Sequence, residues 1–282
     1  MDKNKTYQLG IYEKAIPSTL SWEEKLVVAK KTGFDYFEIS IDETDAKLDR
    51  LNENNPCLNE LKKAIEKVNI PVLSMCLSAH RKYPLGSHDP LKQARGIEIL
   101  EKACRFSVKL GIRIIQMPGY DVYYEDRDES TVQNFEKNLK TCVAIAAKYG
   151  VIIAFETMET LFMDTAKKSM TYVSKNNSPY LQVYPDLGNV TNASRISKIS
   201  VKDDLASAKG HIVAAHLKEI VEGIYREIPY GKGDTRFEEA FTELKKQGVA
   251  LYTSEFWYLG DPKWEEDLVF ANGYFRNLLE KA

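Results

Sequence analysis

The sequence repeats one local signal along its length: a helix-like segment with Lys in its last turn, then Gly, then a run of apolar, β-prone residues. It appears in KKTGFDYFEIS, VKLGIRIIQM, AKYGVIIAFE, SAKGHIVAAH and KKQGVALYTSE. Glycine suits the left-handed residue that follows a helix, and Lys favours the negative helix end. EKVNIPVLSM and KNNSPYLQVY place Asn and Pro in the same role. Repeated helix–turn–strand units predict a parallel β/α architecture.

Counting these units gives eight strands, and helical patterns lie between them. The expected strands are residues 7–13, 36–41, 72–78, 113–119, 151–157, 181–187, 212–218 and 250–256. The clearest helices are 90–110, where Asp89 can cap and Pro90 fits the first turn, and 263–281. An open doubly wound sheet typically has a glycine-rich phosphate-binding turn after its first strand. Residues 10–17, GIYEKAIP, contain no such turn. We therefore predict one domain, residues 1–282, folded as a (β/α)8 TIM barrel.

Composition excludes several classes of protein. The 39 basic and 41 acidic residues give a net charge of −2, without the basic excess that a nucleic-acid surface needs. No run is long enough to cross a membrane, and the first residues do not resemble a signal peptide. The four cysteines form no CxxC pair, so we expect free thiols in a reducing cytosol. We expect a soluble, cytoplasmic homo-oligomer, a dimer, with no nucleic-acid or membrane partner.

Four of the predicted strands end on residues that can bind a metal ion. The strand in VIIAFETM ends at Glu156, and a buried carboxylate is costly unless something pairs with it. Asp186, His216 and Glu255 hold the equivalent place on the next three strands. The carboxyl ends of barrel strands form the active-site face, so these side chains should converge. Three carboxylates and one imidazole would suit one divalent ion: Mn²⁺, Co²⁺, Mg²⁺ or Zn²⁺. The plain alternative is a set of ordinary polar strand ends.

The ligand pattern on an eight-unit barrel resembles the xylose-isomerase-like superfamily of sugar isomerases and epimerases. Within it, SMCLSAHRKYPLGS, IQMPGYDVYY, VYPDLGN and GHIVAAHLKE resemble the L-ribulose-5-phosphate (L-xylulose-5-phosphate) 3-epimerase family of L-ascorbate utilisation. The resemblance implies a metal-dependent epimerase that acts on a ketopentose phosphate in pentose catabolism. The main departures, MET after Glu156 and Glu219 in HLKE, leave the four predicted ligands unchanged.

Inversion of a carbon beside a ketone requires a base on one face and an acid on the other. A bound cation would stabilise the enediolate. We assign the two proton-transfer roles to Glu156 and Glu255, and expect Asp186 and neutral His216 mainly to hold the metal. The same enediolate can be reprotonated at another carbon, so a sugar-phosphate isomerase such as a hexulose-6-phosphate isomerase is the alternative.

Other residues are candidates for binding the sugar phosphate. They are His80, Arg81, Lys82, Lys232, Glu38 and Asn189. Arg81 and Lys82 could instead form a solvated basic turn. Gly231-Lys232-Gly233 follows the seventh predicted strand, where barrels often bind phosphate through backbone N–H groups, or it could be a simple loop. Glu38 could either contact substrate hydroxyls or orient a ligand. Trp257 would cover the site or pack in the core, and GYDVYYEDRDES is expected to form a lid over the barrel mouth.

Two other classes of function are disfavoured. A multi-zinc endonuclease on the same barrel would want many more His ligands than the four histidines here. A non-catalytic sugar-phosphate binding protein would not need carboxylates on both faces of a metal. Solvent deuterium entering a ketose phosphate would separate an epimerase from such a binding protein.

Overall fold

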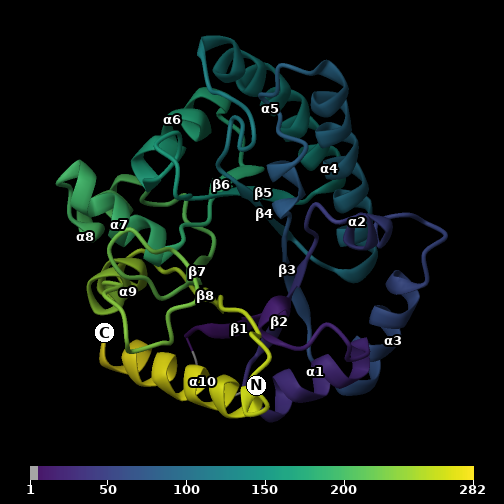
Figure 1. Ribbon diagram of the computed structural model, residues 1–282, viewed down its shortest axis with the longest axis vertical. Coiled ribbons are helices and arrows are strands. Elements are labelled where there is room, and N and C mark those ends of the chain that lie inside the picture. Colours follow the sequence, from purple (N-terminus) through teal and green to yellow (C-terminus); the bar gives the residue numbers. More distant parts are fainter. Residues whose placement is uncertain (1–5) are drawn as a thin grey trace.

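The computed structural model describes residues 6–282, and its centre is a ring of eight parallel strands surrounded by helices (Figure 1). The strands are β1 (Gln8–Tyr12), β2 (Tyr36–Ser40), β3 (Val72–Cys76), β4 (Ile114–Pro118), β5 (Ile152–Glu156), β6 (Leu181–Val183), β7 (Ala215–Leu217) and β8 (Leu251–Ser254). The sheet order runs β6-β5-β4-β3-β2-β1-β8-β7. Isolated parallel bridges, Val183 to Ile212 and Asp186 to His216, join its two ends. The predicted barrel class is confirmed.

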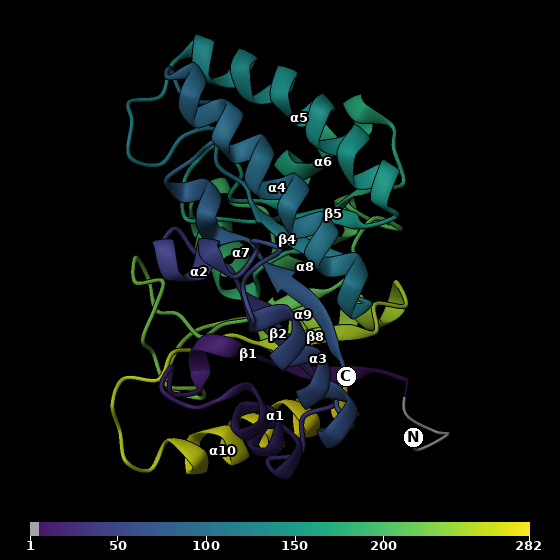
Figure 2. The ribbon, with the colours of Figure 1, turned by 90° about the vertical axis from the view of Figure 1, so that its right-hand side faces the viewer.

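The helices connect successive strands on the outside of the ring. They are α1 (Trp22–Lys31), α2 (Asp45–Asp49), α3 (Cys57–Val68), α4 (Pro90–Leu110), α5 (Glu129–Tyr149), α6 (Ala166–Asn176), α7 (Leu187–Ser197), α8 (Val201–Ser207), α9 (Phe237–Lys246) and α10 (Trp264–Lys281), with short 3-10 turns η1 (Glu13–Ala15) and η2 (Ser78–Arg81). In side view α1 and α10 lie at one edge of the molecule and α4 and α5 at the other (Figure 2). Among residues 6–282 no helix combines the length and apolar character of a membrane span.

The predicted joints between helices and strands have the expected backbone. Each of the five glycines has a positive φ, as have both asparagines of the variant joints: Gly33, Asn69, Gly111, Gly150, Asn177, Gly210 and Gly248. A different constraint applies at Gly10 inside the barrel, where an added Cβ would lie 2.2 Å from the Tyr36 ring. Side chains on β2 can therefore cross the barrel only because β1 has no side chain at that point.

Strands β6 and β7 are shorter than predicted, with three residues each. Pro185 has no N–H to continue a ladder, and Asp186 caps helix α7 instead. The single-domain prediction covers residues 1–282, of which residues 1–5 lie outside the described part of the chain.

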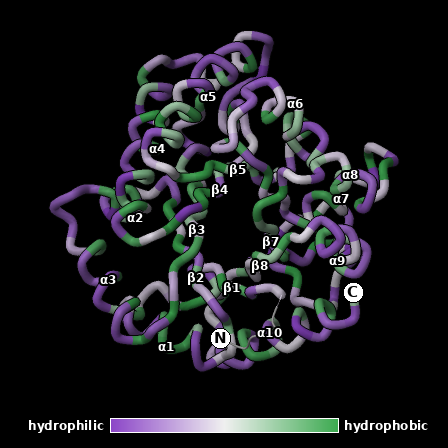
Figure 3. The backbone as a smooth tube through the Cα atoms, turned by 180° about the vertical axis from the view of Figure 1, so that it is seen from behind, coloured by the Kyte–Doolittle hydropathy of each residue, from purple (hydrophilic) through white to green (hydrophobic). Residues whose placement is uncertain are grey.

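The main apolar core lies between the strands and the helices. A second, small cluster of Ile114, Ala154, Tyr184 and Ala214 fills the inside of the barrel. Coloured by hydropathy, the strands form a largely apolar ring, while polar segments dominate the helices and outer loops (Figure 3). All four cysteines are buried and free, as predicted. Side chains on the inner faces of the strands thus point into the barrel, and those at the carboxyl ends of the strands reach its mouth, where the candidate site lies.

Candidate functional site

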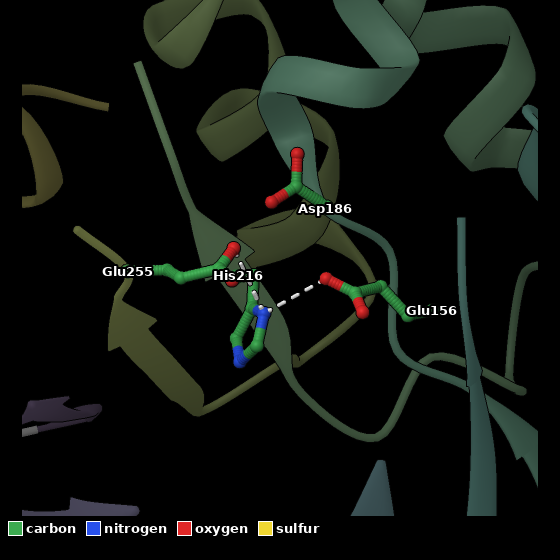
Figure 4. Close-up of side chains that lie close together, drawn as sticks. All are labelled: Glu156, Asp186, His216 and Glu255. Carbon is green, nitrogen blue, oxygen red and sulfur yellow. Dashed lines mark hydrogen bonds and ion pairs between the residues drawn. The ribbon is translucent and has the colours of Figure 1, made fainter. Parts of the chain in front are cut away.

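Glu156, Asp186, His216 and Glu255 converge at the carboxyl ends of the strands. Glu156 is the last residue of β5, His216 lies in β7, Asp186 caps α7 just after β6, and Glu255 directly follows β8. One potential ligand atom from each lies within 4.8 Å of the others. All four side chains are buried, and Glu156 and Glu255 approach His216 from opposite sides (Figure 4).

The His216 ring is held between carboxylates on both of its nitrogens. Its Nδ1 lies 3.1 Å from Glu156 Oε1 and 3.2 Å from Glu255 Oε2. Its Nε2 lies 2.6 Å from Oε1 of Glu38, on β2. Although burial opposes it, the carboxylates of Glu38 and Glu255 raise the pKa of His216 well above its usual value. The distances show that Nδ1 faces the candidate metal position and that Nε2 is directed at Glu38.

Glu38 is fixed by a hydrogen-bond network inside the barrel. Its Oε2 accepts from Ser74 Oγ at 2.6 Å and from the Tyr184 hydroxyl at 2.9 Å. Tyr184 also contacts Thr253, which in turn contacts Tyr36. Of the two roles expected for Glu38, these contacts favour orienting His216 over binding substrate, since both carboxylate oxygens already have protein partners.

A buried lysine, which the sequence analysis missed, lies beside two of the carboxylates. Lys218 Nζ is 3.1 Å from Asp186 Oδ2 and 3.8 Å from Glu255 Oε2. Burial raises the pKa of Asp186 to about 8. Burial acts in the same sense on Glu255, but Lys218 and His216 outweigh it and lower the pKa of that carboxyl. The signal was available, because the predicted strand 212–218 places Lys218 two residues after His216 and so on the same side.

The residues present fit a divalent cation. Three carboxylates and one imidazole give the oxygen-rich, single-nitrogen donor set that Mn²⁺, Co²⁺, Mg²⁺ and Zn²⁺ accept. Asp186 Oδ1 is oriented by the backbone N–H of Asn189 at 2.7 Å. Oδ2 of Asp186 and Oε2 of Glu255 are buried and form only ion pairs, with Lys218 at 3.1 Å and His216 at 3.2 Å, without a well-directed hydrogen bond within the described chain. Such oxygens, close together and incompletely satisfied, are suited to a positive ion.

A small cavity of about 50 Å³ lies over this cluster. Its lining includes two residues predicted to bind substrate, Arg81 and Asn189, together with Trp257. Asn189 donates from Nδ2 to the Thr157 carbonyl, while its buried Oδ1 receives no hydrogen bond within residues 6–282. Two further cations, Lys14 and Arg226, also line this cavity. It is smaller than the several hundred Å³ of a typical ligand pocket.

A larger pocket of about 300 Å³ adjoins the cavity, and Lys218, Glu255 and Trp257 line both. Its outer part combines aromatic side chains with carboxylates. The acidic residues there are Glu227, Asp261 and Asp267. These negative charges disfavour binding of a phosphate group on this side.

Three predicted substrate contacts lie away from the cavity lining. The ring of buried His80 bonds through Nε2 to the Gly96 carbonyl of α4, at 3.0 Å, and burial lowers its pKa to about 4. Lys82 and Lys232 are exposed to solvent. These positions favour packing for His80 and a surface role for the two lysines.

The glycine loop 231–233 also differs from the expected phosphate site. Its Gly231 N–H donates to Oε2 of Glu219 at 3.0 Å, and Oε1 accepts from Thr235 N. At Gly233 an added Cβ would lie 2.2 Å from the Ile220 carbonyl oxygen. The chain's own carboxylate occupies the N–H donor of Gly231, which favours a simple loop over a phosphate site at that position.

The predicted tyrosine lid lies beside the cavity and contacts it through Arg81. Tyr120 is buried and donates to Glu159 at 2.6 Å, and the exposed Tyr124 donates to Glu43. The Arg81 guanidinium lies over the Tyr123 ring, 4.9 Å from its centre. The loop thus holds Arg81 at the cavity, while its movement as a lid stays a prediction.

Comparison with known proteins gives matches over nearly the whole chain. The family model described as xylose isomerase-like TIM barrel matches residues 26–272. L-ribulose-5-phosphate 3-epimerase UlaE of Escherichia coli K12 is 41% identical over 255 residues, covering 90% of this chain and 88% of the relative. The protein of that name from Shigella boydii serotype 18 is 41% identical over 280 residues, covering 99% and 97%.

Solved structures share the fold at low sequence identity. A D-allulose 3-epimerase from Methylomonas sp. has a TM-score of 0.77 and 20% identity, covering 98% of this chain and 99% of that chain. An L-ribulose 3-epimerase has a TM-score of 0.76 and 18% identity, with 98% and 95% covered. The chain therefore belongs to the xylose isomerase-like TIM barrel family and, within it, to the L-ribulose-5-phosphate 3-epimerases, a group of isomerases.

Proposed function

We propose that this protein is a metal-dependent epimerase that inverts C3 of a ketopentose phosphate, interconverting L-ribulose 5-phosphate and L-xylulose 5-phosphate. The observation that carries the proposal is the pair of buried carboxylates, Glu156 and Glu255, on opposite sides of His216. Relatives that are 41% identical over nearly all of the chain bear the name of this activity. The resemblance of the sequence motifs implies a place in L-ascorbate or related pentose catabolism.

One divalent ion would be held by Glu156, Asp186, His216 and Glu255. When bound, it would supply Lewis-acid stabilisation of the negative charge on an enediolate. Glu38 keeps His216 in the orientation in which Nδ1 faces the ion, and Asn189 orients Asp186. The donor set accepts Mn²⁺, Co²⁺, Mg²⁺ or Zn²⁺ alike.

Glu156 and Glu255 carry the proton-transfer roles. One carboxylate removes the C3 proton from its face, and the other, carrying a proton, delivers it to the opposite face. Each turnover therefore exchanges the protonation states of the two residues. The burial of both side chains keeps bulk water from competing for the reactive carbon.

The phosphate group would bind on the side of the cavity that carries Arg81, Lys14 and Arg226. Arg81 is the one predicted phosphate contact that lines the cavity. Arg226 lies over the Trp257 ring at 5.6 Å, in the loop between β7 and α9, and Lys14 pairs with Asp42 at 2.7 Å. Two guanidinium groups that line one cavity suit a doubly charged phosphate.

The buried, free cysteines suit a cytoplasmic location, which we propose together with a homodimeric state and a small-molecule sugar phosphate as the partner. The balanced charge supports the absence of a nucleic-acid partner.

The proposal is tested with chelator-treated enzyme, to which Mn²⁺, Co²⁺, Mg²⁺ and Zn²⁺ are returned one at a time. NMR in D2O with L-ribulose 5-phosphate should show deuterium entering at C3 as L-xylulose 5-phosphate forms. His216→Ala should lose bound metal and turnover together. Deuterium at C1 would instead indicate an isomerase, and hexulose 6-phosphate is the substrate to try next. Absence of exchange with every metal would contradict the assignment.

A further inference from the structure

Lys218 is a buried cation inside the candidate site. It lies at the mouth of the barrel just beyond β7, only 5% exposed, with Nζ 3.1 Å from Asp186 and 3.8 Å from Glu255. A lysine is rarely buried to this degree unless its charge is paired. The pairing is to one predicted metal ligand and to one predicted proton-transfer residue, both on the functional face.

The partners of Lys218 have other donors that fix their positions. Asp186 is held by the Asn189 N–H, and Glu255 by its 3.2 Å contact with His216. Lys218 is therefore not required to orient these two carboxylates. It also lines both the cavity over the cluster and the larger pocket beside it. Its ammonium group is thus placed where it could contact a bound substrate.

The surroundings of the two proton-transfer carboxylates differ on account of this lysine. Within residues 6–282, Lys218 forms ion pairs with Asp186 and Glu255, but none with Glu156. The site therefore has a positively charged hydrogen-bond donor on its Glu255 side. A donor fixed in a buried setting acts more strongly on a developing charge than the same group in water.

We propose that Lys218 is a catalytic residue whose ammonium donates a hydrogen bond to the substrate oxygen that becomes negatively charged during epimerisation. This inference rests on the proposed function. When a carboxylate takes the C3 proton, the C–H electron pair forms the C2–C3 double bond, and the carbonyl oxygen at C2 gains the charge. Lys218 stabilises that oxygen and keeps its own proton. The electron pair returns to C3 when the opposite carboxylate delivers a proton.

A variant at Lys218 should change metal affinity in the opposite direction to a variant at a metal ligand. An ammonium beside the ion-binding carboxylates repels a divalent cation. Its removal should therefore leave metal affinity unchanged or increase it, while turnover falls. A lysine that only held the ligands in place would produce the opposite effect on affinity, because Asp186 and Glu255 would lose their support.

The test compares Lys218→Met, which removes the charge, with Lys218→Arg, which keeps it. Exposed Lys209, in the turn that precedes β7, gives the matched control Lys209→Met. Binding of Mn²⁺ to the chelator-treated full chain is measured by calorimetry, and turnover at saturating Mn²⁺ by NMR. We expect Lys218→Met to bind Mn²⁺ at least as tightly as wild type and to epimerise about 100-fold more slowly. Lys218→Arg should retain more turnover than Lys218→Met, and the control should match wild type.

A tenfold loss of Mn²⁺ affinity in Lys218→Met, or turnover near that of wild type, would overturn the proposal. If Lys218→Met does not fold, as judged by thermal unfolding, Lys218→Gln is measured in its place and judged by the same two criteria. Failure of the wild-type enzyme to exchange C3 would refute the proposed function, whereas the Mn²⁺ comparison tests the lysine without any substrate.

Discussion

Two of the buried ionic clusters within residues 6–282 have opposite charge balances. The first, which we call the Glu13 cluster, surrounds one carboxylate with Lys25, Lys47 and Arg50, at 3.2, 2.6 and 2.9 Å. It lies where β1 and η1 meet α1 and α2. The second, which we call the metal cluster after its proposed role, gathers Glu156, Asp186 and Glu255 around His216, and within residues 6–282 Lys218 is the one lysine or arginine paired with it. In the Glu13 cluster the cations outnumber the carboxylate, whereas in the metal cluster the carboxylates outnumber the lysine.

This difference in charge balance indicates that the Glu13 cluster stabilises the fold and that the metal cluster is suited to catalysis. In the Glu13 cluster the carboxylate also accepts the Ser40 N–H, so its negative charge is fully compensated by the chain itself. Burial opposes ionisation, but Lys47, Arg50 and Lys25 lower the pKa of Glu13 to about 2. At Lys47 the effect of burial is larger than the attraction of Glu13, and the pKa of Lys47 falls to about 8. The cluster therefore stabilises the charged form of Glu13 but not that of Lys47. In the metal cluster Lys218 pairs with two of the three carboxylates, and an added cation would compensate the remaining negative charge.

Glu156→Gln and Glu255→Gln should give the largest effect, on rate. Each retains the side-chain shape and removes a proton-transfer group, which is worth about 100- to 10,000-fold. Epimerisation should be abolished in both directions in each variant. One variant should still exchange the C3 proton of L-ribulose 5-phosphate and the other that of L-xylulose 5-phosphate, as followed by NMR in D2O. Near wild-type interconversion by a metal-loaded variant would refute the two-carboxylate mechanism; exposed Glu265→Gln is the control.

Glu13→Gln should give the largest effect on stability. Removing the carboxylate leaves three cations together, one of them fully buried, at a cost of about 3–5 kcal/mol in the free energy of unfolding. The folded-state pKa lies below the ordinary value of 4.5, so the stabilisation is present above that pH and is lost as the pH falls toward 2. Urea unfolding at several pH values should therefore show a wild-type advantage that shrinks below about pH 4.5. An advantage that is independent of pH would contradict this role.

Glu38→Gln should weaken metal binding by about 10- to 100-fold, because Glu38 supports His216 rather than the substrate. Calorimetry with Mn²⁺ measures this directly. The KM of the metal-saturated variant for sugar phosphate should remain close to that of wild type. A raised KM with unchanged Mn²⁺ affinity would instead assign Glu38 to substrate binding.

Arg81→Met should reduce the preference for a phosphorylated over a free pentulose by about tenfold, the value of one charge-assisted contact. Lys232→Met is the matched comparison, since that lysine is exposed and lies outside the cavity lining. The measurement is kcat/KM for L-ribulose 5-phosphate and for L-ribulose. Loss of preference in the Lys232 variant alone would restore the original assignment of phosphate to the glycine loop.

The smallest expected effect concerns the metal cluster without its ion. In chelator-treated protein Glu156→Gln removes one of three crowded carboxylates, which should raise the free energy of unfolding by about 1 kcal/mol. Denaturation of both proteins in the presence of chelator tests this. A loss of stability comparable to that in Glu13→Gln would show that the two clusters do not differ in the way their charges suggest.

The barrel was predictable from the sequence because its determinants are local. Gly111 and Gly150 mark helix ends through their own backbone conformation, and each is followed closely by a strand. Glu156, Asp186, His216 and Glu255 could be grouped because equivalent strand ends meet at one face of a barrel. The metal-binding and catalytic roles assigned to them stay predictions.

Contacts between distant segments could not be predicted in the same way. Glu38 and His216 are separated by 178 residues, and the hydrogen bond between them depends on the exact direction of two side chains inside the barrel. The Glu13 cluster likewise joins three helical segments through long side chains. The glycines of the loop at Gly231 suggest an anion site, but the anion that the Gly231 N–H binds is the Glu219 side chain, a contact that no local pattern indicates.

The thin closure between β6 and β7 suggests how the enzyme could be divided. A chain cut in the exposed turn at Lys198, between α7 and α8, would leave Glu156 and Asp186 on one fragment. His216 and Glu255 would be on the other, and the Asp186–His216 bridge would cross the boundary between them. Neither fragment would own a complete set of ligands. Reassembly of such a split protein could thus be made conditional on a divalent ion, with enzyme turnover as its reporter.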